Sequence, residues 1–343
     1  MKRFKSLGVT LAACALTASL FTGCGKETSS ETSTEPSEEM ASPTLTIGYS
    51  DWPGWVAWEV AVQKGFFEKA GLDVKFEWFE YVPSMDAFAS KQLDAVCMTN
   101  GDTLVTGATG GKGVMILIND YSDGNDIVVA APGIETVADL KGKSIGVELG
   151  FVSHLLLNNG LKSAGLTESD VTLVNVPTDQ TPQTLASGDV SAIVAWQPNS
   201  GQALKAVAGS KAVYSSADAP GLIYDVLAVS PESLAANPEE WKTVVKVWYE
   251  TVDFIKDPAT RDEAIAIMAS RVELEPEEYA PFLEGTYLLT LDEAKEIASS
   301  TEEGFGSLLG STKIVDSFQV ENEVYAEPQD MDSYIDMSLL LSL

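Results

Sequence analysis

Apolar and polar residues follow three patterns along this chain, and each pattern predicts one type of secondary structure. Apolar positions recur with a period near 3.6 through Val56–Ala70 and Ser153–Ala164, which predicts two amphipathic helices. They alternate with polar positions along Asp73–Phe79, which is typical of a half-buried strand. Continuous apolar runs at Ala95–Met98 and Ala192–Ala195 predict strands that are buried on both faces.

These elements occur in the same order twice, in Leu45–Asp102 and again in Lys143–Gln197. Three pairs of matching segments, TIGY with SIGV, AGLDV with AGLTESDV and FASKQLDAV with LASGDVSAI, are offset by 98, 94 and 97 residues. A repeat of this size indicates a duplicated architecture. Helices between strands imply parallel βαβ units, so we predict two similar α/β lobes. Ligands of open α/β sheets bind beyond the carboxyl ends of the strands.

The loops that follow the predicted strands combine aromatic with acidic residues, as in SDWPGW, TNGDT, ELGFVSH and WQPNS. Ordinary surface loops favour small polar residues without large aromatic side chains. Apolar walls with a few polar groups are typical of a small-molecule pocket. We therefore predict a binding site that contains Asp51, Trp52, Trp55, Tyr81, Asn100, Asp102, Glu148, Phe151 and Trp196.

Several of these residues also fit purely structural roles. Asp51 and Asp102 stand where helices begin and could cap them. Trp58 lies on the first predicted helix, three residues after Trp55, which favours a place in the core. The sole histidine, His154, is expected to be structural.

In these segments the chain resembles the bacterial ABC-importer substrate-binding proteins of the sulfonate, taurine, nitrate and thiamine-precursor superfamily. The most diagnostic phrases are KGFFEKAGLDV and DLKGKSIGV, and the resemblance covers about Thr44–Lys256. It implies an α/β, two-lobed periplasmic-binding-protein fold, with hinged parallel-type sheets and a central cleft. It also implies docking on a membrane permease that a separate ATPase drives.

The resemblance further implies how the chain is divided between the lobes. Residues 44–128 and 226–343 would form lobe I, and residues 129–225 would form lobe II. The segment YDVLAVS resembles the strand on which the chain returns to lobe I, which places Tyr224 and Asp225 near the hinge. The C-terminal helices would then cover lobe I. We add Asp225 to the predicted ligand-binding residues.

The N-terminus has the layout of a bacterial lipoprotein signal. A basic start and a fifteen-residue apolar stretch precede TGC, so residues 1–23 would be cleaved and Cys24 would carry a lipid. An ordinary cleaved signal with an incidental cysteine is the alternative. Residues 24–43 are polar and acidic and lack aromatic side chains, which indicates a tether. We expect the protein to lie outside the cytoplasm, anchored to the membrane of the cell envelope.

Charge narrows the choice of ligand. The chain has 21 Lys and Arg and 51 Asp and Glu, and loss of Lys2, Arg3 and Lys5 with the signal gives 18 − 51 = −33. Such a chain does not bind nucleic acid electrostatically. The predicted cleft loops contain no Lys or Arg, whereas an anion site wants such donors.

We therefore favour a small cationic nitrogen compound of the guanidinium or amidinium type. Carboxylates would pair with this cation and indole faces would attract it. The alternatives are an anion such as an aliphatic sulfonate, taurine or nitrate, and a thiamine-precursor pyrimidine. A sensory lipoprotein without a transport role is a third possibility.

Enzyme functions find little support in the sequence. There is no Gly-x-Ser-x-Gly motif, and His154 has no obvious nucleophile beside it. Gly107–Gly113 resembles a phosphate loop but lacks its first Gly and its final Ser or Thr. Cys97 stands in an apolar strand and is expected to be inert. We predict a binding protein without a cofactor or metal, and calcium held by several Asp side chains stays open as an alternative.

Overall fold

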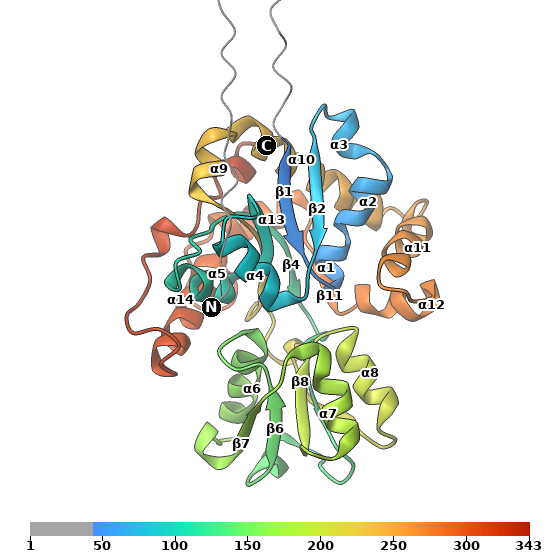
Figure 1. Cartoon of the computed structure of the whole chain (residues 1–343), viewed down its shortest axis with the longest axis vertical. Coiled ribbons are helices and arrows are strands. Elements are labelled where there is room, and N and C mark those ends of the chain that lie inside the picture. The colour runs from blue at the N-terminus through green and yellow to red at the C-terminus, as the bar shows by residue number, and fades with distance from the viewer. Residues whose placement is uncertain (1–43) are drawn as a thin grey trace, which may run out of the picture. The chain divides into compact units, whose positions relative to one another are not determined.

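Two mixed β-sheets organise the chain, one in each lobe (Figure 1). The structure, a computed structural model, describes residues 44–343, which belong to the unit Ser42–Leu343. The predicted signal, tether and lipidation site at Cys24 lie outside the described residues. The sheet of lobe I has the order β11-β4-β10-β3-β1-β2, and that of lobe II has the order β7-β6-β8-β5-β9.

The strands of lobe I are β1 (Leu45–Tyr49), β2 (Val74–Trp78), β3 (Ala95–Thr99), β4 (Val114–Ser122), β10 (Tyr224–Val229) and β11 (Thr286–Leu288). The strands of lobe II are β5 (Ile127–Ala130), β6 (Ser144–Val147), β7 (Thr172–Asn175), β8 (Ala192–Ala195) and β9 (Lys211–Ser215).

The predicted repeat is present in both sheets. In lobe I, β1 lies between β2 and β3 and is parallel to both, and in lobe II, β6 lies in the same way between β7 and β8. Even the register is shared, since Ile47 is opposite Ala95 and Ile145 is opposite Ala192. The prediction of two similar α/β lobes is confirmed.

The sheets are nevertheless mixed and not purely parallel. Strand β10 is antiparallel to β3 and β4, and β5 is antiparallel to β8 and β9. The passage of the chain between the lobes explains this. The parallel strands of each lobe end at the cleft, so a strand that begins where the chain has just crossed must run the opposite way.

The crossings occupy the stretches between Ser122 and Ile127 and between Ser215 and Tyr224. The boundaries predicted at 128/129 and 225/226 therefore fall inside β5 and β10. Tyr224 and Asp225, predicted at the end of lobe II, belong to the sheet of lobe I. A crossing needs a short polar segment free of sheet pairing, and the residues Asp123–Asp126 provide one.

Fifteen α-helices of the described residues surround the sheets. Those of lobe II are α6 (Val152–Ser163), α7 (Thr181–Ser187) and α8 (Asn199–Ala206). Those before the first crossing are α1 (Pro53–Val56), α2 (Trp58–Gln63), α3 (Phe66–Lys69), α4 (Tyr81–Ala89) and α5 (Asn100–Ala108). Those after the return are α9 (Pro231–Ala236), α10 (Pro238–Lys256), α11 (Arg261–Arg271), α12 (Pro276–Tyr279), α13 (Leu291–Ser299), α14 (Leu308–Glu321) and α15 (Ser338–Leu341).

The C-terminal helices cover lobe I, as the family resemblance implied (Figure 1). Helix α10 packs on α2 and β4, and the short α15 at the C-terminus packs on α10 and β4. Trp58 is fully buried, and its ring centroid lies 4.5 Å from that of Trp248 on α10. Its predicted place in the core is confirmed. Within residues 44–343, no helix is both long and apolar enough to span a bilayer.

Candidate functional site

A small cavity lies where the loops at the strand ends of both lobes meet. Its volume is about 10 Å³, room for about one water molecule and far below the range of pockets that hold drug-sized ligands. Lobe I and the crossings supply most of the wall, and lobe II adds Val152 and Trp196. The lining residues are Trp52, Trp55, Tyr81, Thr99, Asp126, Val152, Trp196, Ile223 and Asp225.

Four aromatic side chains form much of this wall. The rings of Trp55 and Tyr81 are stacked at 5.3 Å, and Trp196 of lobe II meets Tyr81 edge-on at 5.2 Å. Trp52 stands at the N-cap of α1, where Pro53 starts the helix directly after the loop that follows β1. All four side chains are buried. The aromatic and acidic turn Tyr49–Trp58 therefore contributes Trp52 and Trp55 to the wall of this pocket.

Carboxyl groups gather around the same cavity. Asp126 and Asp225 line it, and Asp102 lies beside it, accepting a hydrogen bond of 2.6 Å from the Tyr81 hydroxyl. Asp120 on β4 is opposite Asp225 on β10 in the sheet register. All four are at least 97% buried, and none forms an ion pair with a Lys or Arg among the described residues.

Burial raises the pKa of each of these carboxyl groups. The pKa of Asp102 is raised to about 6, and those of Asp120 and Asp126 to about 7. The pKa of Asp225 is also raised well above its ordinary value, because burial acts together with the negative charges of Asp120 and Asp126. Negative charge in this cavity is thus unfavourable until a positive group arrives.

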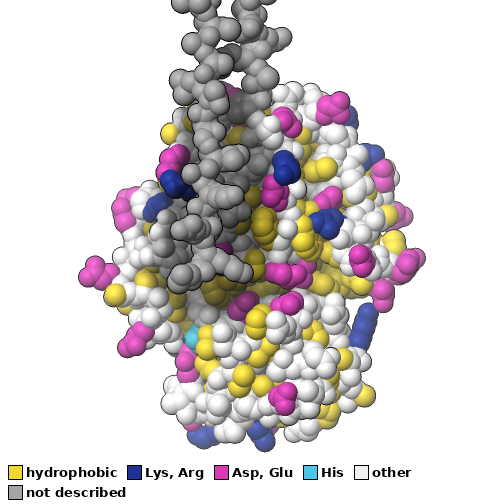
Figure 2. Space-filling view, in the orientation of Figure 1, with side chains coloured by type: hydrophobic (Ala, Val, Ile, Leu, Met, Phe, Trp, Pro, Cys, Tyr) yellow, Lys and Arg dark blue, Asp and Glu magenta, His cyan; other side chains and the backbone are white. Residues whose placement is uncertain are grey.

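A second cavity adjoins the first at the mouth of the cleft. Four of its lining residues are acidic, namely Asp51, Glu80, Glu148 and Asp179, and no lining residue in the described chain is basic. Glu148 accepts a hydrogen bond of 3.0 Å from Thr178, and burial raises its pKa to about 7. Figure 2 shows acidic side chains on both sides of the groove where the lobes meet.

Asp51 connects the two lobes directly. Its two carboxylate oxygens accept hydrogen bonds of 3.0 Å from the Trp196 indole and from the Asn199 amide, both in lobe II. These contacts hold the lobes together around the inner cavity. Asp51 therefore lies at the predicted site but acts between the lobes, and its side chain is not part of the inner wall.

Two further predicted residues, Asn100 and Phe151, line neither cavity. The Asn100 amide donates to the Ser311 and Thr312 hydroxyls of α14 and accepts from the Tyr224 amide, so its polar atoms are occupied. Phe151 is half-buried at the N-cap of α6 and packs on the core, while its neighbour Val152 reaches the cavity. We interpret both as parts of the supporting structure.

Asp120 and Asp126 were not predicted from the sequence. Both stand in the segment NDYSDGND, which directly follows the apolar run VMILI. An acid-rich segment at the end of a buried strand was the available signal. The role of these two acids depends on the pairing of β4 with β10. The residue pattern within a single segment cannot predict that pairing.

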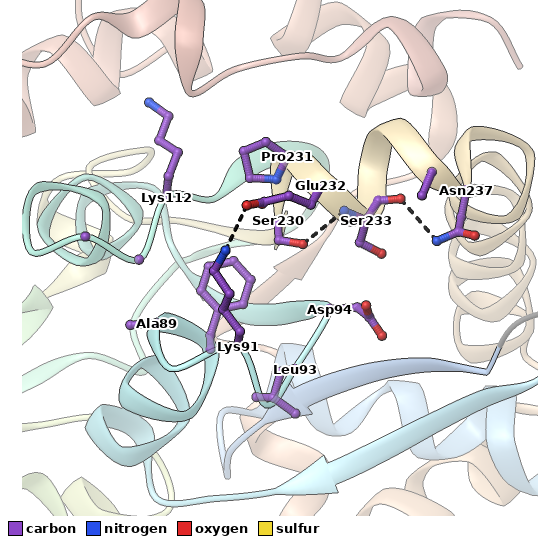
Figure 3. A pocket seen from close by; sticks show the side chains of 14 residues that line it. Ala89, Lys91, Leu93, Asp94, Lys112, Ser230, Pro231, Glu232, Ser233 and Asn237 are labelled. Carbon is purple, nitrogen blue, oxygen red and sulfur yellow. Dashed lines mark hydrogen bonds and ion pairs between the residues drawn. The ribbon is translucent and has the colours of Figure 1, made fainter.

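A separate pocket occupies the opposite end of the strands of lobe I (Figure 3). Asp94, just before β3, lines it, whereas Thr99 at the other end of β3 lines the inner cavity. In this separate pocket, Lys91 forms an ion pair with Glu232 at 2.9 Å, and Lys112 donates a hydrogen bond of 2.7 Å to the Ser333 hydroxyl. It contains none of the predicted site residues.

The two lobes, each with its own sheet, and the small cavity where their loops meet are the features of two-lobed periplasmic binding proteins. The chain belongs to the NMT1-like family, whose model matches residues 38–269. A Brucella abortus protein that bears the name of a binding protein is 29% identical over 214 residues, 61% of this chain and 66% of that protein. The chain thus matches slightly less than two thirds of that relative.

Two further relatives are named for their ligands. An Escherichia coli protein named for binding aliphatic sulfonates is 25% identical over 47% of this chain and 51% of its own. The arginine-binding extracellular protein ArtP of Bacillus subtilis is 27% identical over 44% of this chain and 58% of its own.

Solved structures share the fold at lower identity. The periplasmic aliphatic sulphonate binding protein SsuA of Escherichia coli has a TM-score of 0.71 at 20% identity, covering 87% of this chain and 99% of its own. The desulfurization enzyme DSZB has a TM-score of 0.61 at 17% identity, covering 87% and 98%. Both binding proteins and an enzyme therefore have this fold. The function has to be inferred from the residues of the site.

Proposed function

We propose that this chain is the solute-binding component of an ABC importer and captures a small cation of the guanidinium or amidinium type by closure of its lobes. The observation that carries the proposal is the Asp225 carboxylate. It is buried and lines the inner cavity, and its Oδ2 receives no hydrogen bond from an N–H group or a hydroxyl group in the described chain. A buried acceptor without a donor is costly, and a ligand that brings N–H donors and positive charge removes this cost.

The walls favour a flat cation over other positive groups. Indole faces attract cations by about 0.5–2 kcal/mol each, and Trp52, Trp55 and Trp196 all line the cavity. A guanidinium ion presents N–H donors in a fixed plane that matches a carboxylate bidentately. Arginine carries the same group, so the similarity to the arginine-binding relative supports this ligand class.

An anionic ligand, such as a sulfonate, taurine or nitrate, meets an unfavourable lining. An anion site uses N–H donors, hydroxyls, Arg or Lys. The charged groups that line the inner cavity in the described chain are Asp126 and Asp225. Burial disfavours their ionised forms even without a second negative charge nearby.

A pyrimidine ligand and a catalytic role would each use the cavity differently. A thiamine-precursor pyrimidine would use the aromatic walls without needing a full positive charge. Catalysis is not supported, because Cys97, the free thiol of the described residues, is buried in β3 and its pKa is raised by burial.

Calorimetry at about pH 8 tests the ligand. We expect guanidinium chloride to bind with micromolar or better affinity, while nitrate and taurine show no heat of binding. A pyrimidine and an alkylamine serve as comparison ligands of similar size. Binding of nitrate or taurine without binding of guanidinium would reverse the assignment.

The proposal includes a lipid anchor on Cys24, in line with the N-terminal sequence. We expect Cys24→Ser to release the protein from the membrane fraction of cells into the soluble fraction, because a serine at this position lacks the thiol that carries the lipid. Fractionation followed by immunoblotting measures this, with Cys97→Ser as the matched control. Unchanged membrane association of the Cys24 variant would argue against the anchor.

A partner permease with its ATPase would receive the solute from the closed lobes. A sensory lipoprotein would bind the same ligand without such a partner. Loss of guanidinium uptake by cells that lack this chain would favour the importer, and intact uptake would favour the sensor.

A further inference from the structure

Asp120 and Asp225 form a buried pair of carboxyl groups behind the inner cavity. The antiparallel pairing of β4 with β10 sets them opposite each other, and their side chains are within hydrogen-bonding reach. The Oδ2 atoms of both residues have no partner among the described donors. Two ionised carboxylates contain only acceptors, so the pair can form a hydrogen bond only while one of them holds a proton.

Asp120 is held in place from two sides. Its Oδ1 accepts a hydrogen bond of 3.0 Å from the Trp52 indole, which fixes one aromatic wall of the cavity. Its Oδ2 lies against Gly54 of α1, where a Cβ atom would overlap it. Asp120 does not line the cavity itself. It therefore acts on a ligand through Trp52 and Asp225.

The surroundings of the pair provide no compensating positive charge in the described chain. The groups that face it from neighbouring elements are acids or neutral, and they come from β3, α5, α12 and the loop after β4. They are Cys97, Asp102, Asp126 and Tyr279. Without a ligand, the pair is expected to retain one proton and a single negative charge.

We propose that Asp120 is a positioning residue that couples capture of the cation to release of a proton from the Asp120–Asp225 pair. This inference rests on the proposed cation function. Before binding, the O–H of one carboxyl donates to the other. When the cation enters, this proton passes to solvent, both carboxylates are ionised, and N–H groups of the ligand donate to Asp225 in its place. The positive charge of the ligand enters the site as the positive charge of the proton leaves it.

Calorimetry of guanidinium chloride binding, in two buffers of different ionisation enthalpy near pH 7, measures the released protons. We expect the wild-type protein to release about one proton more than Asp120→Asn. The asparagine keeps an acceptor for the Trp52 indole and offers an N–H to Asp225, so Asp225 stays ionised in the free protein. The affinity for guanidinium should therefore rise less steeply with pH in Asp120→Asn than in the wild-type protein. The difference between the two slopes should be up to about tenfold in affinity per pH unit.

Two further variants separate positioning from general structure. Gly54→Ala fits the helical backbone of α1, but its Cβ would overlap both Asp120 Oδ2 and the Trp52 indole nitrogen that Asp120 holds. We expect it to weaken guanidinium binding at least tenfold. Asp316→Asn removes a buried acid on α14, outside the cavity, and should leave both affinity and proton release unchanged.

The outcomes distinguish this inference from the function on which it rests. Binding of guanidinium to the wild-type protein without release of a proton would overturn the coupling and leave the cation function intact. Equal release by wild type and Asp120→Asn would overturn the role of Asp120. Failure of the wild-type protein to bind guanidinium at any pH would overturn the cation function itself, and the inference with it.

Discussion

Asp225→Asn is expected to weaken binding of guanidinium at least 30-fold while making the ligand-free protein more stable. Removing one partner of a buried, hydrogen-bonded charge pair costs about 2 kcal/mol or more, and 1.4 kcal/mol corresponds to a factor of ten. In the ligand-free protein the same change removes a carboxyl group whose pKa is raised by burial and by Asp120. The asparagine also supplies an N–H that the Asp120 carboxylate lacks.

Titration calorimetry at about pH 8 measures the first effect, and a thermal melt of the ligand-free protein measures the second. Asp316→Asn is the matched control, since Asp316 is a buried acid that accepts hydrogen bonds from Tyr325 and Gln329. It should lose stability and keep its affinity. A fall in both affinity and stability for Asp225→Asn would mean that Asp225 serves the fold and not the ligand.

The parts of this molecule that follow local patterns could be predicted from the sequence. The two copies of the βαβ unit were recognisable because each strand, helix and loop recurs at nearly constant spacing, and their register in the sheets agrees. Trp52, Tyr81 and Trp196 were found because each lies shortly after a strand of one copy, and Trp55 because it belongs to the same turn as Trp52. Loops after parallel strands converge at one edge of the sheet, which is a local rule.

The parts that depend on strands distant in the sequence could not be predicted in this way. Asp120 becomes important only because β4 pairs with β10, about a hundred residues later. Asn100 directly follows β3 as expected, but it begins α5 and not a loop, and α14 arrives from the C-terminal region and takes up its amide. Asp51 faces the cleft as expected, but the approach of lobe II pairs it with Trp196. Tertiary contacts decided all three roles.

The buried acids also determine how stability depends on pH. Carboxyl groups of the unfolded chain ionise near pH 4, whereas burial raises the pKa of Asp102 to about 6 and those of Asp120 and Asp126 to about 7. Between these values the native protein binds more protons than the unfolded chain. The free energy of unfolding therefore falls as the pH rises through this window, and it is highest at the acidic end.

We expect the melting temperature of the ligand-free protein to fall by more than about 5 °C between pH 5.5 and pH 8. A carboxyl group whose pKa is raised by about three units costs about 4 kcal/mol when ionised, and 1 kcal/mol shifts the melting temperature by roughly 2–4 °C in a chain of this order of size. Thermal melts across this range test the expectation, and Asp225→Asn should show a smaller fall. Guanidinium should restore stability most strongly at pH 8, where the carboxylates are ionised.

A constant melting temperature would contradict the expectation in an informative way. It would show that the lobes separate without a ligand and that water reaches the carboxyl groups, so that their pKa values return toward ordinary ones. The Asp51 contacts to Trp196 and Asn199 would then form only on capture. In that case the burial of the negative charges would be unfavourable only when the lobes close, and not in the ligand-free protein. The cation would then have to offset this cost during binding.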